Sequence, residues 1–412
     1  MNFKDKYMLE RYEQILVYSK LEMERRWQLA RKIMTEQNAD ALIVLEGSYE
    51  GYNYWFTGNR EPEAIIIPKE GDITAVITNE LNQQKEYQYD RAVQTKKMPG
   101  KKKIYPVHPA LHFVQNFDSR DLEKSLKGKK NPRLAFIHPE VLRQTMYQNM
   151  KAVLGEFTMF DMGIPLDAVR VIKSEEERYL INQTNVMNEK LMAAARQVIR
   201  EGRSIKEITD EMQYLAMQLG SGGHFVHVFC LNVGPQDKPG IDTMGRLEFP
   251  GYRLEHNDKA FMLIETNGPG GYYSALGRYF VMGKASDDLK KHWNMAVKAQ
   301  QNAGRLMKPG TSVREIFNEN YKFITEECGF KTNHQNYLHS LGFQYGEQPY
   351  LNAPSETVPL QAGMHYIAHP VIQRAYPDTK EEDGIFALDT YYVTENGGVR
   401  ANQFPQEIME LD

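Results

Sequence analysis

The sequence has few of the features that mark a secreted, disulfide-bonded or membrane-spanning protein. Only two cysteines, Cys230 and Cys328, occur among its 412 residues, and they do not form a CxxC pair. This count argues against a disulfide framework and against a cysteine-ligated zinc site. No apolar run approaches the roughly 20 residues that span a bilayer. The charged N-terminus also lacks the apolar core and cleavage site of a signal peptide, so we expect a cytoplasmic protein.

An excess of charge of one sign is also missing. The 50 Lys and Arg residues nearly balance the 54 Asp and Glu residues, which leaves a formal net charge of −4 at pH 7. The basic segment 96–103 has no aromatic residues interleaved at a stacking spacing. The sequence therefore gives no electrostatic reason to expect binding to nucleic acid or to a membrane, and we expect a small molecule as the partner.

Length and pattern predict two domains, because the chain is about two to three times as long as a typical domain. The first part mixes helical spacing with apolar runs typical of strands, of which 41–45 and 64–68 are examples. Then follow a Pro/Gly turn, an expected short strand, and Ser174 with a glutamate three residues later, which indicates the start of a helix. We predict an α/β N-terminal domain over 1–166 and a second domain over 167–412.

The second domain contains a weak internal repeat. Residues 200–208 match residues 308–316 at a constant offset of 108 residues. Each copy has a serine after a glycine and a glutamate three residues later, a pattern that by itself is common at helix starts. The strand pattern that follows each copy favours a duplicated α/β unit with a pseudo-two-fold axis.

The most informative segment is 263–280, a predicted strand pair around a glycine-rich turn. Its run Gly271-Tyr-Tyr-Ser-Ala-Leu-Gly-Arg278 resembles a hairpin of the creatinase, aminopeptidase P and prolidase family, and especially that of creatinase. Further motifs follow in the family's order, at 338–342, 360–364 and 393–397. The resemblance covers nearly the full chain. It implies an α/β (α+β) protein with a creatinase-type N-terminal domain and a duplicated C-terminal "pita-bread" domain.

The resemblance also implies that the family's metal site has changed. Metallopeptidases of this family hold two divalent ions with two aspartates, one histidine and two glutamates, and the ions activate a water. The matching positions here are, in order, Glu265, Ala275, His339, His369 and Leu388. Alanine and leucine cannot coordinate a metal, which argues against a dinuclear centre. The set of Glu265, His339 and His369 suits a single divalent transition metal, which stays open beside a metal-independent site with no cofactor.

Without a metal, proton transfer must do the chemistry, and a histidine and a carboxylate in hydrogen-bond reach are the minimum. We assign Glu265 and His369 as the acid and base groups, with His339 assisting. An ungapped match to the family would place Ile264 at the first aspartate, so Glu265 requires a one-residue deletion in the turn. His227 is a secondary candidate, because the family often has a substrate-facing histidine near this strand. The alternative is a core histidine whose hydrogen bonds are satisfied within the protein.

Substrate binding is also implied by the resemblance. Arg60 matches a loop that in creatinase reaches into the site of the partner subunit and holds the substrate carboxylate, which implies a homodimer. A guanidinium suits that task through bidentate hydrogen bonding, although most arginines simply lie at the surface. Tyr272, Tyr273 and Arg278 either line the pocket or pack within the hairpin.

The predicted function is that of a hydrolase similar to creatinase or ectoine hydrolase, which cleaves a C–N bond in a small carboxylate-bearing nitrogen compound. Gly277 stands where creatinase has a glutamate, which argues against creatine itself. One alternative is a mononuclear-metal lyase or a hydrolase similar to Xaa-Pro peptidases. Another is a catalytically inactive binding homologue. Apolar filling around Ala275 and Leu388 would favour the binding homologue, whereas convergent polar groups would favour an enzyme.

Overall fold

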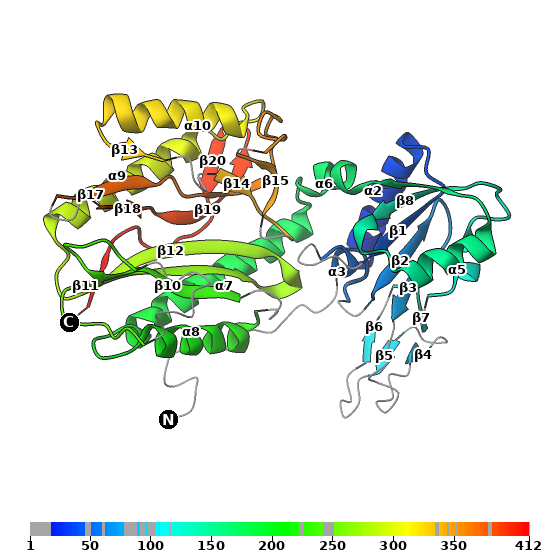
Figure 1. Ribbon diagram of the computed structural model, residues 1–412, viewed down its shortest axis with the longest axis horizontal. Coiled ribbons are helices and arrows are strands. Elements are labelled where there is room, and N and C mark those ends of the chain that lie inside the picture. The colour runs from blue at the N-terminus through cyan, green and yellow to red at the C-terminus, as the bar shows by residue number, and fades with distance from the viewer. Residues whose placement is uncertain are drawn as a thin grey trace. The chain divides into compact units, whose positions relative to one another are not determined.

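The computed structural model describes residues 18–45, 51–59, 62–77, 89–90, 95–97, 104–106, 108–115, 117–221, 226–241, 251–333, 338–343, 346–351, 353–377 and 381–411. The chain divides between Arg170 and Val171 into two compact units, an N-terminal unit and a C-terminal unit (Figure 1). In the described part of the chain, no helix is long and apolar enough to cross a membrane.

The N-terminal unit is built on a six-stranded sheet of order β7-β3-β2-β1-β8-β9, in which β1 runs antiparallel to β2 and parallel to β8. All residues of β1 and β2 are buried, which confirms the two strands predicted from their apolar runs. Its elements are α2 (Lys20–Glu36), β1 (Ala41–Leu45), α3 (Tyr52–Thr57), β2 (Ala64–Pro68), β3 (Ile73–Ile77), β4 (Tyr89–Asp90), β5 (Thr95–Lys97), β6 (Ile104–Pro106), β7 (Leu111–Gln115), α4 (Ser119–Ser125), β8 (Arg133–Ile137), η1 (Pro139–Val141), α5 (Gln144–Leu154), β9 (Thr158–Asp161) and α6 (Gly163–Arg170).

The short strand predicted for the junction between the two halves is wrong. The segment forms α6, an eight-residue helix that begins at Gly163. Pro165 lies in the first turn of this helix, where a missing backbone N–H costs no intrahelical hydrogen bond. Pro165, which in the sequence suggested a turn, is therefore compatible with the start of a helix.

The C-terminal unit carries a larger sheet, which in the described residues has the order β10-β11-β12-β19-β16-β14-β15, with β20 beside β19 and β21 beside β12. A second small sheet has the order β13-β17-β18. The elements are α7 (Glu175–Val198), α8 (Ile205–Leu219), β10 (Val226–Pro235), β11 (Asp258–Asn267), η2 (Pro269–Gly271), β12 (Tyr273–Met282), α9 (Asp287–Leu306), α10 (Val313–Lys322), η3 (Phe323–Glu327), β13 (Lys331–Thr332), β14 (Leu338–Ser340), β15 (Glu347–Tyr350), β16 (His365–Ala368), β17 (Ile372–Tyr376), β18 (Glu381–Ile385), β19 (Leu388–Thr394), β20 (Gly397–Arg400) and β21 (Met409–Leu411).

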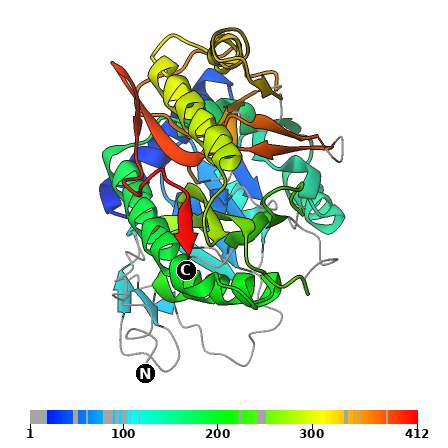
Figure 2. The same cartoon turned by 90° about the vertical axis from the view of Figure 1, so that its left-hand side faces the viewer.

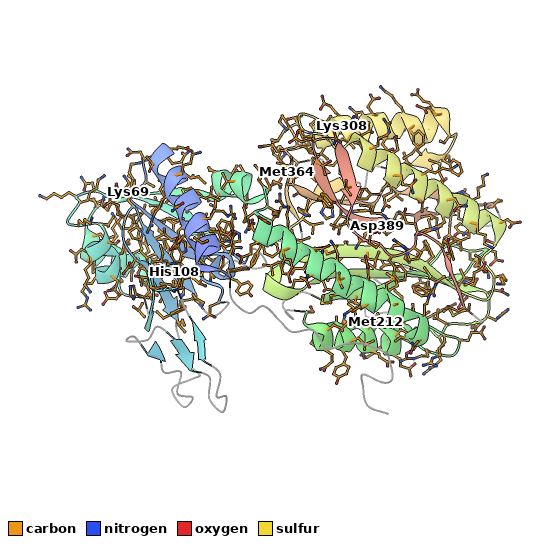
Figure 3. All side chains as sticks on the ribbon, turned by 180° about the vertical axis from the view of Figure 1, so that it is seen from behind. Lys69, His108, Met212, Lys308, Met364 and Asp389 are labelled. Carbon is orange, nitrogen blue, oxygen red and sulfur yellow. The ribbon has the colours of Figure 1, made fainter. Side chains whose placement is uncertain are left out.

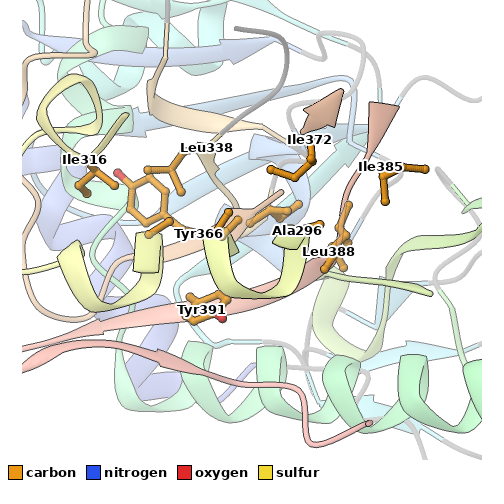
Figure 4. Close-up of a cluster of buried hydrophobic side chains, with 14 of the residues drawn as sticks. Ala296, Ile316, Leu338, Tyr366, Ile372, Ile385, Leu388 and Tyr391 are labelled. Atoms are coloured by element: carbon orange, nitrogen blue, oxygen red, sulfur yellow. The ribbon is translucent and has the colours of Figure 1, made fainter. Parts of the chain in front are cut away.

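Each half of this unit packs a pair of helices against its strands. The pair α7 and α8 covers one face of β10–β12 through a cluster that includes Met212 of α8 (Figure 3) and Ile264 and Leu276 of the strands. The pair α9 and α10 packs against the strands of the second half, where Ile316 and Tyr366 belong to one buried cluster (Figure 4). Figure 2 shows α7 and α8 on one side of the strands and α9 on the other. The strands thus lie between two helix pairs.

The predicted helix starts of the repeat are confirmed. Ser204 and Ser312 are the N-caps of α8 and α10, and each forms a complete capping box with the glutamate three residues later. In the second copy, the hydroxyl of Ser312 accepts a bond of 3.2 Å from the backbone N–H of Glu315, and the Ser312 N–H donates to the Glu315 carboxylate at 2.7 Å. Both donors at the start of the helix are therefore satisfied.

A Ser312→Ala variant should lose about 1 kcal/mol of unfolding free energy, because one backbone N–H at the start of α10 loses its acceptor. Urea unfolding followed by circular dichroism measures the change. Ser312→Asp is the matched control, since it keeps an acceptor at the N-cap and should stay within about 0.5 kcal/mol of the parent. Equal losses in the two variants would show that the cap hydrogen bond does not stabilise the helix.

Candidate functional site

The register of the first three strands places predicted site residues on one face of the sheet. His227 of β10 pairs with Glu265 of β11, and Glu265 pairs with Ala275 of β12. Residues directly opposite each other, and residues two apart on one strand, point to the same face. Ile264 instead points to the opposite face and packs in the cluster of α7 and α8. Glu265, and not Ile264, is therefore the residue opposite Ala275.

The same face continues into the second half of the sheet. Leu388 of β19 pairs with Gly277, which is two residues after Ala275 on β12. Thr390 lies two residues after Leu388 on β19 and pairs with Ile367 of β16. Ile367 in turn pairs with His339 of β14. His369 follows Ile367 by two residues and contacts His339. All five positions that match the family's metal ligands thus lie on one face of a single sheet.

His339 and His369 form a buried pair. Their ring centroids are 5.4 Å apart with an interplanar angle of 76°, an edge-to-face contact. Nδ1 of His339 lies 3.2 Å from the carbonyl oxygen of Ser340, so it carries the proton, and Nε2 has the lone pair. Among the described residues, the buried Nε2 of His369 has no hydrogen-bond partner. One ring nitrogen of His369 is therefore available to a ligand.

Burial keeps both rings of this pair neutral near pH 7. It lowers the pKa of His339 to about 4. It also lowers the pKa of His369 well below the ordinary value, and the neighbouring His339 lowers it further. Neutral imidazoles can accept hydrogen bonds and transient protons, and an imidazolium formed in this apolar site would give up its proton readily.

Glu265 and His227 form the second polar group of this face. Glu265 lies near the C-terminal end of β11 and is only 3% exposed. His227 is half-buried beside the ring of Phe229, at 5.1 Å between centroids, and burial lowers its pKa to about 4. Directly paired residues on neighbouring strands have Cβ atoms about 5 Å apart, close enough for long side chains to interact. The register therefore pairs a carboxylate with a neutral imidazole.

The surroundings of Ala275 and Leu388 are apolar. Both belong to one buried hydrophobic cluster together with Phe261 of β11, and Figure 4 shows Leu388 within it. The ring of Phe261 contacts that of Phe386 in a tilted arrangement, at 4.6 Å between centroids, and the Phe386 ring is 5.9 Å from that of His369. A pair of divalent ions, which needs hard oxygen ligands, does not fit these residues. The apolar side chains around Ala275 and Leu388 are the feature expected of a binding homologue. The two polar pairs on this face, Glu265 with His227 and His339 with His369, are the feature expected of an enzyme.

A mononuclear centre is not preformed either. In the part of the chain that the structure describes, no group of three His, Cys, Asp or Glu side chains is placed to hold a metal ion. The set of Glu265, His339 and His369 therefore does not converge as a ligand group in this conformation. The two imidazoles contact each other, and the carboxylate lies on another strand of the same face.

The hairpin residues assigned to substrate binding mostly contact protein groups. Arg278 points to the opposite face from Ala275, where its guanidinium donates to Asp389 Oδ1 at 2.8 Å and to the carbonyl oxygen of Gly277 at 2.7 Å. The hydroxyl of Tyr272 donates to Glu177 Oε1 at 2.6 Å. These two residues therefore support the strands. Tyr273 is 6% exposed and shares the face of Ala275.

One sequence candidate, Arg60, which was assigned to the substrate carboxylate, lies outside the described residues.

Thr390 is a site residue that sequence reasoning missed. Within the described strands, β12 and β19 pair only at two positions, Leu276 with Asp389 and Gly277 with Leu388. Beyond these two pairs, the backbone N–H of Ala275 donates a hydrogen bond of 2.9 Å to the hydroxyl of Thr390. This side-chain bond takes the place of the next backbone hydrogen bond between the two strands. The side chain thus joins the two halves of the sheet beside the candidate site. No sequence signal separates this threonine from any other strand threonine.

Lys259 is a second missed residue, on the same face of β11 as Phe261 and Glu265. Its ammonium group is buried, donates to the carbonyl oxygen of Lys238 at 2.5 Å, and lies 3.5 Å from Asp383 Oδ2. Burial lowers the pKa of Lys259 to about 8. A lysine inside an apolar strand is the signal that could have revealed it. Its contacts hold the turn that follows β10.

Comparison with known proteins adds to this geometry. The family described as Metallopeptidase family M24 matches residues 180–395, and the Creatinase/Prolidase N-terminal domain matches residues 26–172. The Xaa-Pro dipeptidase of Pyrococcus furiosus is 23% identical over 403 residues, which cover 94% of this chain and 100% of that protein. Creatinase of a Bacillus species is 24% identical over 403 residues, with coverage of 94% and 92%.

A solved structure agrees with these matches. The X-Pro aminopeptidase of Thermotoga maritima superposes with a TM-score of 0.70 at 19% identity, over 94% of this chain and 99% of that chain. The predicted resemblance and the predicted fold, a creatinase-type domain followed by a pita-bread domain, are thereby confirmed. With a match that spans half of its residues, the chain belongs to metallopeptidase family M24 and carries a creatinase/prolidase N-terminal domain.

Proposed function

We propose that this protein is a hydrolase that cleaves a C–N bond in a small carboxylate-bearing nitrogen compound without a dinuclear metal centre. The observation that carries the proposal is the pairing of Glu265 with His227, on the sheet face that also carries the neutral pair of His339 and His369. Relatives named Xaa-Pro dipeptidase and creatinase support a hydrolytic reaction. A homodimer in the cytoplasm remains our expectation.

The proposed reaction needs one base and one acid. Glu265 takes a proton from a water molecule, whose oxygen forms the new bond to the substrate carbon. The C–N bond breaks, and the nitrogen leaves with this same proton, which passes from Glu265 to the neutral imidazole of His369 and from there to the nitrogen. Burial holds the pKa of His369 well below its ordinary value, so its imidazolium forms only transiently and gives up the proton readily. His339 orients the ring of His369 through their edge contact, and His227 holds the carboxylate of Glu265.

Substitution of the two acid/base groups tests this assignment. Glu265→Gln and His369→Gln should each lower kcat/KM by about 10²- to 10⁴-fold, because each removes one proton transfer. Guanidino acids, cyclic amidines and N-acyl amino acids are the compounds to screen for released product. Glu319→Gln is the control, since that carboxylate is exposed on α10 and should leave the rate unchanged. Full activity of Glu265→Gln would refute the mechanism.

Elemental analysis of the purified protein separates this proposal from its mononuclear-metal alternative. We expect no stoichiometric iron, zinc or manganese and no loss of activity after dialysis against a chelator. A stoichiometric metal that is lost in His339→Ala would instead support a lyase or an Xaa-Pro peptidase-like hydrolase that uses Glu265, His339 and His369.

A binding homologue is the second candidate, and the apolar cluster around Ala275 and Leu388 favours it. The same screen addresses it. If no compound is turned over, and Glu265→Gln binds ligands as the parent protein does, the binding role replaces the enzymatic one.

A further inference from the structure

Gly277 has no room for a side chain. A Cβ atom at this position would lie 2.3 Å from Cζ and 2.9 Å from Cε1 of Phe261, closer than real Cβ atoms approach. The backbone of Gly277 lies outside the left-handed region, so its conformation does not require glycine. The ring of Phe261 is therefore the reason that glycine is needed here.

The same ring reaches the position of the family's second glutamate. Cβ of Leu388 lies 3.1 Å from the point that a Cβ of Gly277 would occupy, so the tip of Phe261 and the side chain of Leu388 converge there. Phe261 is fully buried, and its ring also contacts the ring of Tyr279, at 5.0 Å between centroids. Little space is left between β11, β12 and β19 at this level.

A second ring extends the filled region to the position of the first glutamate. The ring of Phe386 contacts that of Phe261 in a tilted arrangement, at 4.6 Å between centroids, and contacts the ring of His369 at 5.9 Å between centroids. The two phenyl rings thus form a continuous contact from Leu388 to His369. A cation held by side chains at these two positions would need that space, and a phenyl ring cannot replace the oxygen or nitrogen ligands of a divalent ion.

We propose that Phe261 itself keeps a pair of metal ions out of this site, in addition to the loss of ligands at Ala275 and Leu388. Restoring the carboxylates alone would then fail to restore a dinuclear centre. The inference rests on the position of the site under the proposed function but not on the reaction assigned to it. Under this proposal, Phe261, which is not at a ligand position, controls how many metal ions the protein can bind.

Metal stoichiometry tests the proposal directly. One protein carries Ala275→Asp, His369→Glu and Leu388→Glu, and a second carries the same substitutions with Phe261→Ala. Isothermal titration with Mn²⁺ and elemental analysis after gel filtration should show at most one ion in the first protein and two in the second. Two ions in the first protein, or the same number in both, would overturn the proposal.

A steric test covers the case in which the restored-ligand proteins do not fold. Gly277→Ala should lower the thermal midpoint strongly in the parent protein, and by no more than about a third as much in a Phe261→Leu background, because the ring that blocks the Cβ is gone. Gly251→Ala is the matched control, since a Cβ there meets no atom within 4 Å. Equal losses in both backgrounds would show that Phe261 does not fill this space. Neither measurement uses turnover, so the proposal stands or falls independently of the hydrolase assignment.

Discussion

An Arg278→Met variant should lose about 3–5 kcal/mol of unfolding free energy, because it leaves the carboxylate of Asp389 buried without its principal cation. Both side chains are fully buried, and the guanidinium also donates to the carbonyl oxygens of Pro405 at 2.6 Å and of Gly277 at 2.7 Å. These contacts join β12 to β19 and to the C-terminal segment. Removing them leaves both carbonyl oxygens without this donor as well.

Urea unfolding at neutral pH measures this loss. Lys206→Met is the matched control, because its ion pair with Asp210 is more than half exposed and should contribute less than about 1 kcal/mol. Arg400, 3.4 Å from Asp389, remains as a second cation and places the expected loss of Arg278→Met toward the lower end of the range. A loss no greater than that of Lys206→Met would show that the buried pair does not hold the two strands together.

Local signals in the sequence were sufficient for much of the fold. The capping serines Ser204 and Ser312 begin their helices as predicted, because a hydroxyl at the N-cap needs only the next turn of backbone. The buried strands β1 and β2 are continuous apolar runs, which the pattern reveals directly. The helix α6 was missed because a proline in a first turn and a proline in a loop look alike in sequence.

The candidate site was predictable only in part, because it depends on strand register. A shift of one residue in the turn between β11 and β12 moves every side chain of a strand to the other face. The sequence alone therefore left Glu265 and Ile264 as rivals, and the pairing of Glu265 with Ala275 decides between them. The contact of Phe261 with Gly277 joins two strands and depends on the rotamer of a buried ring, which no spacing pattern encodes.

Acidification should destabilise the protein steeply between pH 6.5 and about 4, because it contains buried neutral histidines. Burial lowers the pKa of His339 to about 4 and that of His365 to about 3, from 6.5. Within this window the unfolded chain binds protons that the folded protein does not bind. Stability therefore rises with pH across the window and is lost as pH falls, by up to a few kcal/mol for the two groups together.

Urea unfolding at a series of pH values from 7 to 4.5 measures the slope, and His365→Gln should make it shallower. His365 is the better position for this test, since its ring packs near Tyr392, with Nδ1 3.3 Å from the carbonyl oxygen of Gly363, and is not assigned to catalysis. His256→Gln is the control, because that ring is exposed and should leave the slope unchanged. Carboxylates contribute to acid unfolding in every variant, so the difference in slope between His365→Gln and His256→Gln is the decisive quantity. Identical slopes in the two variants would mean that burial of His365 does not oppose its protonation, and that acid unfolding of this protein has another origin.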